Sequence, residues 1–166
     1  PPPPSVSSAA SDEYKRQLDN IRSAHNVGSI FRSCDAFLID EIILCGITAK
    51  PPNKEIRKTA LGSTDSVKWS YFENIKDAIL KLKQEKYQII SVEQADKSTD
   101  LKNFKIQSKK KYAIIFGNEI NGVNQKVIDM SDDVVEIPQF GTKHSFNVSV
   151  CVGIVIWDFF TKIKTN

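Results

Sequence analysis

The sequence predicts an α/β fold, in which helices cover both faces of a parallel sheet. Short runs of four to six apolar and β-branched residues recur along the chain, and amphipathic stretches separate them. Runs without a polar face are typical of strands that are buried on both sides in a parallel sheet. The chain has 166 residues, 40% of them apolar, which is enough for one domain with a sizeable core.

Four of these runs are expected as strands, at residues 41–46, 87–92, 111–116 and 134–137. The first closes on Gly46, the third stops at Gly117 and the fourth is ended by Pro138. Glycine and proline are common where regular structure ends.

Helices are expected at residues 73–86, at residues 123–130 and after Phe146. In the first of these, apolar residues recur three and four positions apart, which is helical spacing. The last segment is ambiguous, because its valines alternate as in a strand while residues 154–156 are consecutively apolar. Its length of about 20 residues favours a helix buried on most sides. Its apolar stretch is too short for a membrane span, which takes about 18 apolar residues.

Composition excludes several classes of protein. Lys and Arg number 23 against 20 Asp and Glu, so the net charge is only +3; this allows a nucleic acid partner without arguing for one. Three widely spaced cysteines, Cys34, Cys45 and Cys151, give neither a disulfide framework nor a cysteine metal site. We therefore expect no metal and a reducing, cytoplasmic location. Residues 1–13 are rich in Pro, Ser and Ala and are expected as a flexible tail before one domain at 14–166.

Residues 117–122, Gly-Asn-Glu-Ile-Asn-Gly, follow an expected strand and precede an expected helix. Open α/β sheets place their ligand loops at this point. The segment is not a phosphate-binding loop, because Val123 and Asn124 stand where that motif has Lys and Ser or Thr. It also lacks the middle glycine of a dinucleotide fingerprint. Taken alone, it is better explained as an ordinary strand-to-helix turn that needs a positive φ.

Two further segments combine polar residues with a helix start. In residues 20–37, Asn26 could cap a helix, and Arg32 could form a surface ion pair with Asp35. In residues 137–149, Ser145 or Asn147 could be a helix N-cap. Each segment alone therefore has a plain structural explanation.

Together, the three segments resemble the motifs of the SpoU/TrmH family of SPOUT RNA methyltransferases. Residues 26–37 match N-x-G-x-x-x-R-x-x-x-A-F, residues 117–123 match G-x-E-x-x-G-[VL], and residues 137–150 match I-P-x-x-G-x-x-x-S-[LF]-N-V-S-V. Two departures are small, since Phe146 replaces the commoner leucine and Asn118 stands where serine or alanine is frequent. Residues 92–94 and 98–101 are weakly similar to members that methylate guanosine in the tRNA D-loop.

The resemblance implies a Rossmann-like parallel sheet with a C-terminal trefoil knot, a homodimer, and 2′-O-ribose methylation of RNA with S-adenosyl-L-methionine. Residues at the family's cofactor positions are Gly117, Ile137 and Phe146. A glycine permits close approach of the ligand, and the two apolar side chains can flank its purine.

The resemblance also assigns Arg32 to the transfer step. A free guanidinium has a pKa above about 12 and stays protonated at neutral pH. We therefore favour Arg32 as a positive charge that orients the ribose phosphate and lowers the pKa of the 2′-hydroxyl. Positioning roles are implied for Asn26, Glu119, Ser145 and Asn147. Candidates for RNA phosphate contacts are Arg22, Lys54, Arg57, Lys58, Lys143 and His144. DNA lacks the 2′-hydroxyl and should be inert.

Three alternatives stay open at this point. The same chemistry could act on ribosomal RNA or on the tRNA wobble ribose. The chain could be a silent RNA-binding member of the family. Against this, a silent descendant has no chemical reason to carry all of Arg32, Glu119, Ser145 and Asn147. An unrelated nucleotide-binding module conflicts with the missing phosphate-loop signatures.

Overall fold

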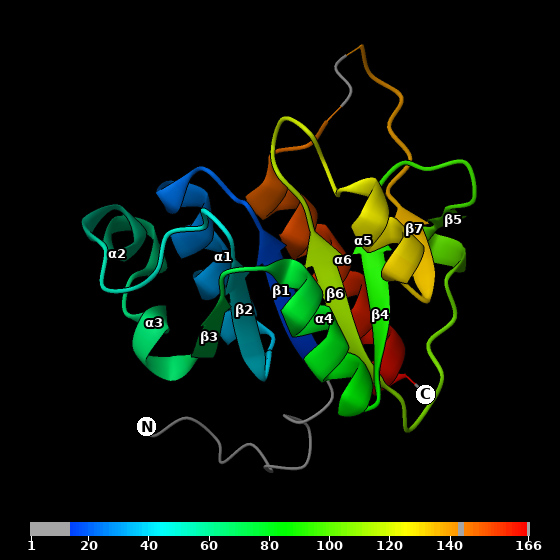
Figure 1. The fold of residues 1–166 in the computed structure, drawn as a ribbon, viewed down its shortest axis with the longest axis horizontal. Helices are drawn as coiled ribbons and strands as arrows, with labels where there is room; N and C mark the ends of the chain where they lie inside the picture. Colours follow the sequence, from blue (N-terminus) through cyan, green and yellow to red (C-terminus); the bar gives the residue numbers. More distant parts are fainter. Residues whose placement is uncertain (1–13, 143–144, 166) are drawn as a thin grey trace.

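The computed structural model describes residues 14–142 and 145–165. The expected tail at 1–13, Lys143 and His144 lie outside these residues. The described chain contains a seven-stranded sheet with the order β3-β2-β1-β6-β4-β7-β5, and all of its pairings are parallel. The predicted parallel α/β fold is therefore confirmed (Figure 1).

The strands are β1 Tyr14–Asp19, β2 Glu41–Cys45, β3 Lys68–Phe72, β4 Tyr87–Val92, β5 Thr99–Asp100, β6 Lys111–Phe116 and β7 Asp133–Glu136. The helices are α1 Ala24–Ala36, α2 Lys54–Ala60, α3 Ser63–Ser66, α4 Ile75–Gln84, α5 Gln125–Met130 and α6 Val148–Lys164, with a short 3₁₀ turn η2 at Leu101–Asn103.

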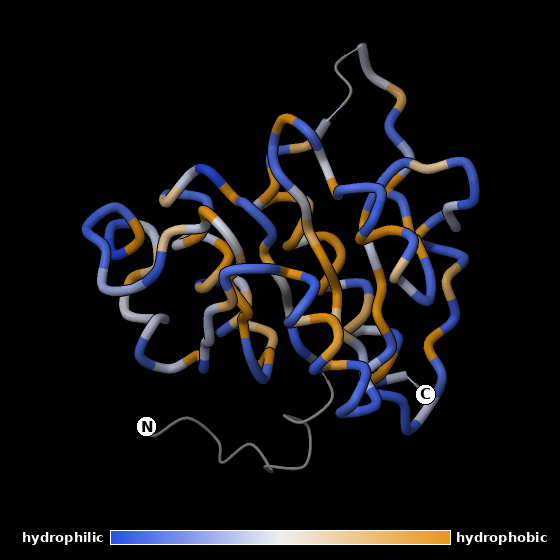
Figure 2. The backbone as a smooth tube through the Cα atoms, viewed as in Figure 1, coloured by the Kyte–Doolittle hydropathy of each residue, from blue (hydrophilic) through white to orange (hydrophobic). Residues whose placement is uncertain are grey.

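Helices cover the sheet on both faces and divide the core in two. Strand β2 shows the division, because Ile42 and Leu44 belong to the cluster under α1 and α6 while Ile43 and Cys45 belong to the cluster under α4 and α5. Figure 1 shows α4 and α5 in front of the sheet and α6 behind it, and Figure 2 shows the central strands as the apolar part of the chain. None of the described helices is both long and apolar enough to cross a membrane.

The four expected strands are present with ends shifted by at most one residue. Helices α4 and α5 begin two residues later than expected, because the side chains of Asn74 and Asn124 cap them. The ambiguous last segment is helix α6, and the prediction of Asn147 as its N-cap is confirmed. The prediction of Asn26 as a cap is wrong: Ser23 caps α1, and its hydroxyl oxygen accepts from the Asn26 backbone N–H at 3.2 Å.

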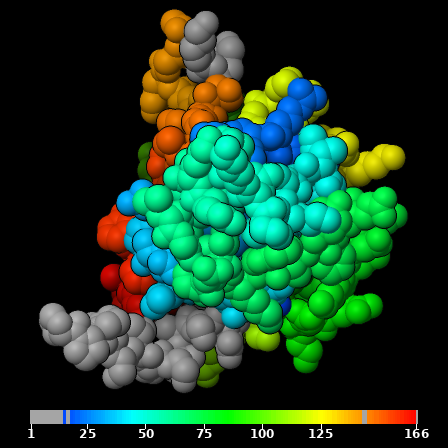
Figure 3. All heavy atoms as spheres, turned by 90° about the vertical axis from the view of Figure 1, so that its left-hand side faces the viewer, coloured from blue at the N-terminus to red at the C-terminus, as the bar shows by residue number. Residues whose placement is uncertain are grey.

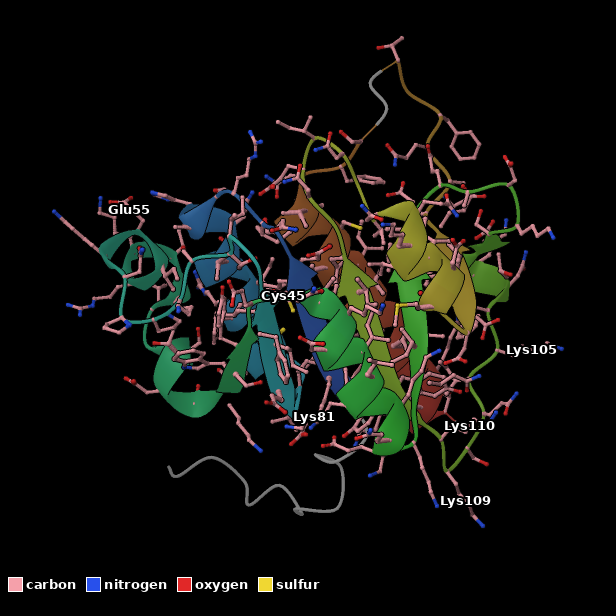
Figure 4. All side chains as sticks on the ribbon, in the orientation of Figure 1. Cys45, Glu55, Lys81, Lys105, Lys109 and Lys110 are labelled. Carbon is pink, nitrogen blue, oxygen red and sulfur yellow. The ribbon has the colours of Figure 1, made fainter. Side chains whose placement is uncertain are left out.

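Charged side chains at two places in the chain, the 109–111 lysine run and the Arg32 and Asp35 positions, are exposed at the surface. All three residues of the 109–111 lysine run, at the entrance to β6, are exposed. Lys109 and Lys110 point to solvent at the end of the sheet opposite the 117–122 loop (Figure 4). The expected Arg32–Asp35 ion pair is absent from the described residues, and Asp35 instead accepts from the Ser66 hydroxyl at 2.7 Å.

Helices α2 and α3 form a layer against α1 at the left of Figure 1, and their blue-green atoms lie in the middle of the face shown in Figure 3. Gly28 of α1 makes this close packing possible. A Cβ atom at this position would lie 2.0 Å from Thr59 Oγ1 and 2.4 Å from the Ile56 carbonyl oxygen. The backbone oxygen cannot move away without shifting α2.

We therefore expect Gly28→Ala to lower the free energy of unfolding by about 1–3 kcal/mol, as overpacked cores do. Ser33→Ala on the same helix adds no atoms and should change it by less than about 0.5 kcal/mol. Urea unfolding followed by circular dichroism measures both. A Gly28→Ala protein as stable as wild type would show that α2 does not pack on α1 in this way.

Candidate functional site

The loop after β6 is a tight turn that requires glycine at both ends. Asn118 and Gly122 exchange backbone hydrogen bonds of 3.1 and 2.8 Å, and Gly122 has a φ of +66°. A Cβ atom on Gly117 would lie 2.3 Å from the carbonyl carbon of Gly122. The interpretation of this segment as a turn with a positive φ is confirmed at Gly122, while Gly117 is required by the closeness of the chain to itself.

Glu93, at the end of β4, braces this turn from the side. Its Oε2 accepts a hydrogen bond from the Val123 backbone N–H at 2.8 Å. The same oxygen would be 2.1 Å from a Cβ atom on Gly122. Glu93 was not among the predicted site residues, although residues 92–94 carried a weak signal of similarity.

Glu119 joins the turn to the segment that precedes α1. Its carboxylate accepts from the backbone N–H groups of Arg22, at 3.1 Å, and Ser23, at 3.3 Å. Burial raises the pKa of Glu119, but these hydrogen bonds and one from the Asn26 side chain outweigh burial, so its pKa lies below the ordinary value. The carboxylate is thus held in its ionised form.

Asn26 completes a chain of side-chain contacts across the three predicted motifs. Its Oδ1 accepts from Asn147 Nδ2 at 3.2 Å, and its side chain also hydrogen-bonds Glu119. Asn147 in turn accepts from the Ser149 backbone N–H at 2.9 Å as the cap of α6. The structure therefore brings together one predicted polar residue from each motif.

A cavity of about 340 Å³ opens beside this network, between the ends of β4, β6 and β7 and the start of α6. Its lining includes Gly117, Glu119, Ile137, Ser145 and Phe146. All three predicted cofactor residues thus face one space, whose size falls in the range of small-molecule sites.

Cys151 of α6 also lines the cavity and was not predicted as a site residue. Burial, and then the charge of Glu93, raise the pKa of its thiol to about 12. The thiol is therefore protonated at neutral pH, when only a thiolate would be a good nucleophile. Cys151 contributes surface to the cavity and no covalent chemistry. All three cysteines are free thiols.

Arg32 is the predicted residue that the structure keeps apart from the others. It is exposed on α1 and does not belong to the described lining of the cavity. Six residues separate it from Asn26, so the two side chains leave α1 in different directions. Within one protomer, Arg32 and the polar network do not form a single cluster.

The predicted RNA contacts are spread over two places. Arg22 is exposed in the loop between β1 and α1, and Arg57 and Lys58 are exposed on α2. Lys58 Nζ pairs with Glu55 Oε1 at 3.0 Å, and Glu55, labelled in Figure 4, also contacts the His25 ring. An exposed pair of this kind contributes little stability.

We expect Glu119→Gln to lower the free energy of unfolding at pH 7 by about 1–3 kcal/mol, because an amide N–H₂ would face backbone N–H donors. The pKa of Glu119 is lower in the folded chain, so its stabilisation is present above the unfolded pKa of about 4.3 and is lost as pH falls through the folded value.

The difference between wild type and variant, measured by urea unfolding from pH 7 to pH 3, should therefore narrow in acid. The exposed Glu73 offers the matched control, and Glu73→Gln should change the stability at pH 7 by less than about 0.5 kcal/mol. A difference that widens in acid would rule out the proposed role of the Glu119 carboxylate.

Comparison with known proteins identifies the family of this chain. The model of the SpoU rRNA Methylase family matches residues 17–157. An uncharacterized tRNA/rRNA methyltransferase of Borreliella burgdorferi is 34% identical over 141 residues, which cover 85% of this chain and 60% of the relative. A tRNA (guanosine(18)-2'-O)-methyltransferase of Aquifex aeolicus is 28% identical over 144 residues, which cover 84% and 65%. The chain thus spans less than two thirds of either relative.

Solved structures of other proteins share the fold of this chain. The AdoMet-bound rRNA methyltransferase from Sinorhizobium meliloti superposes with a TM-score of 0.83 at 26% identity, covering 89% of this chain and 56% of that one. The A. aeolicus TrmH/SpoU tRNA modifying enzyme has the same fold, with a TM-score of 0.80 at 24% identity and coverages of 91% and 75%. Because the family model matches most of the sequence, the chain belongs to the SpoU rRNA methylase family.

Proposed function

We propose that this chain is an S-adenosylmethionine-dependent RNA 2′-O-ribose methyltransferase. One observation carries the proposal: Gly117, Ile137 and Phe146 line a single cavity, which adjoins the polar network of Asn26, Glu119 and Asn147. The relatives named as AdoMet-bound and as guanosine 2′-O-methyltransferases support it.

Bound in this cavity, S-adenosylmethionine would supply a methyl group on a positively charged sulfur. The protein's task is then to bring a ribose 2′-oxygen in line with that group and to stabilise its developing negative charge. Ile137 and Phe146 offer apolar surface on the cavity wall. The Asn26–Glu119–Asn147 network fixes the rim of the cavity, and Ser145 adds a hydroxyl there.

Arg32 is the proposed charge that orients the ribose phosphate. Because it lies away from the cavity of its own protomer, we place it in the cavity of a partner within a homodimer. Each cavity would then hold the donor with residues of one protomer and receive the transfer residue from the other.

An exposed apolar face supports this homodimer. Val150, Ile154 and Trp157 of α6 recur at helical spacing and are 51%, 37% and 55% exposed. The ring of Trp157 contacts that of Phe37, at the end of the helix that carries Arg32, with centroids 5.6 Å apart. Contiguous exposed apolar surface of this kind is typical of protein interfaces.

The finer parts of the function are also proposals. We favour tRNA as substrate, with a D-loop guanosine as target, because relatives with that activity align over most of the chain. The basic residues Arg22, Arg57 and Lys58, with Lys143, would contact phosphates. The trefoil knot and the cytoplasmic location remain expectations; the shared cavity of the β6 loop, the segment after β7 and the start of α6 is compatible with the knot.

The function is tested by incubating the protein with methyl-labelled S-adenosylmethionine and total RNA, and by mapping the bonds that become resistant to alkali. A resistant bond at one position confirms ribose 2′-O-transfer and names the substrate, whether tRNA D-loop, wobble ribose or ribosomal RNA. Cofactor binding without transfer to any RNA would instead indicate a silent RNA-binding protein.

Arg32→Lys should lower turnover about 100-fold, because lysine keeps the charge but loses the planar fork, while calorimetry should find nearly unchanged cofactor affinity. Near-normal turnover would refute the assignment.

Mixing inactive Arg32→Ala and Asn147→Ala proteins tests the placement of Arg32. If Arg32 acts across the dimer, a mixed dimer has one intact site, in which Asn147 of one protomer meets Arg32 of the other. Half of the dimers are mixed after subunit exchange, so roughly a quarter of the activity should be restored. Without any restoration, Arg32 acts within its own protomer.

Trp157→Glu should convert the dimer to a monomer in analytical ultracentrifugation, because a charge would be buried in the proposed interface. Leu80→Glu is the matched control: Leu80 is 45% exposed on α4, which covers the opposite face of the sheet. Leu80→Glu should leave the molecular mass measured by sedimentation equal to that of the dimer. A wild-type protein that sediments as a monomer, or a Trp157→Glu protein that stays dimeric, would contradict the proposed interface.

A further inference from the structure

A second cavity, of about 470 Å³, lies on the other side of the 117–122 loop. It opens at the carboxyl ends of β1 and β6, and its lining includes Asp19, Arg22 and Asn121. It shares with the first cavity only residues of the loop between them. Of its lining residues, the proposed function uses only Arg22, as a phosphate contact.

The topology of the sheet gives this position a special meaning. Neighbouring strands β1 and β6 lead to helices on opposite faces, since α1 packs in the cluster with α6 and α5 packs in the cluster with α4. The chain therefore leaves these two strand ends in opposite directions. In open α/β sheets the crevice at such a switch point is the usual place of a ligand, and the second cavity occupies it.

Several amides in the wall are already occupied by the fold. Asn20 Oδ1 accepts from the Ile47 backbone N–H at 3.0 Å, and Asn118 Nδ2 donates to the Asn20 carbonyl at 2.8 Å. Asn124 caps α5 through the Lys126 backbone N–H at 2.9 Å. These contacts hold the wall rigid and leave recognition to other groups.

Asp19 is the one acidic residue in the described lining of this cavity, and it is 5% exposed. One of its oxygens accepts from Asn20 Nδ2 at 2.9 Å. A carboxylate so deeply buried loses the water that would otherwise stabilise it, and burial raises its pKa. A ligand that donates hydrogen bonds to it would replace that water.

The lining also supplies a cation and an exposed apolar side chain. Arg22 is exposed there, with its backbone fixed by Glu119. Ile47 is 65% exposed and lines the same cavity. The combination of a buried acceptor, an exposed cation and an apolar side chain fits a nucleotide, whose base offers donors and whose phosphate is an anion.

A carboxylate is an acceptor only. Among the RNA bases, guanine alone presents two adjacent donor groups, N1–H and N2–H₂, on its Watson–Crick edge, and these can bind both oxygens of one carboxylate. We propose that the second cavity binds a guanine of the RNA substrate, with Asp19 accepting from N1–H and N2–H₂ and Arg22 pairing with the phosphate. This inference rests on the proposed function, because it takes RNA as the substrate.

The test uses the full chain, saturated with S-adenosylhomocysteine so that the first cavity is blocked. Guanosine, inosine and adenosine 5′-monophosphates are titrated, and backbone amide shifts are followed by NMR. Guanosine monophosphate should shift the amides of residues 118–125. Inosine monophosphate lacks the N2 amino group and should bind about tenfold more weakly, as expected for one lost hydrogen bond to a charged group.

Variants separate the two contacts. Asp19→Asn should abolish the preference for guanosine over inosine monophosphate. Arg22→Gln should weaken both nucleotides by about the same factor, roughly tenfold, because it acts on the phosphate. Lys83→Gln removes the same charge from an exposed position on α4 and should change nothing. Thermal melting checks that Asp19→Asn folds; if it does not, the inosine comparison and Arg22→Gln decide the matter.

Equal affinities for guanosine and inosine monophosphates, or shifts confined to other residues, would overturn the proposal. So would a folded Asp19→Asn protein that keeps the preference. These outcomes are independent of methyl transfer. If the protein methylates RNA but shows no guanine preference in this cavity, only the proposed guanine site is refuted. If it binds guanine but transfers no methyl group to RNA, the guanine site stands and the proposed methyltransferase activity is refuted.

Discussion

The geometry of the site depends on one half-buried carboxylate, that of Glu119. It accepts two backbone N–H groups that precede α1, from Arg22 and Ser23, and the Asn26 side chain. Backbone N–H groups at the start of a helix have no partners within the helix. A carboxylate satisfies them and is itself kept ionised by them, so the β6 loop and the α1 start hold each other at a fixed distance. Asn147 then joins α6 to the same point through Asn26.

The turn that carries Glu119 is rigid because the backbone passes so close to itself. At Gly117 a side chain would collide with the backbone of Gly122, and at Gly122 it would collide with Glu93. Glycine is usually associated with flexibility, but here the missing side chains let Glu93 bond the Val123 N–H directly. The wall between the two cavities is thus fixed by contacts from β4 on one side and from the α1 start on the other.

The sequence predicted those parts of the molecule whose signal is local. Apolar runs located β2, β4 and β6, and motif order located Asn26, Glu119 and Asn147. Strand β1, an inner strand of the sheet, was not predicted because its residues are mostly polar. Lys15 is only half-buried there, and its ammonium group forms a 2.8 Å ion pair with Glu41 on β2. Glu93 was missed for a different reason, since its contact with the Val123 N–H joins residues 30 positions apart in the sequence. Ser23 rather than Asn26 caps α1, a distinction of one helical turn that composition cannot make.

Asn118 shows how a departure from a family pattern can have a structural cause. Its Nδ2 donates to the Asn20 carbonyl at 2.8 Å, and its Oδ1 accepts from the Ile120 and Asn121 N–H groups at 2.8 and 3.1 Å. An alanine could make none of these bonds, and a serine hydroxyl is too short to span both directions. In this chain the asparagine therefore ties the end of β1 to the β6 turn from within. Asn118, Glu119 and Glu93 thus hold, from three directions, the loop that separates the two cavities.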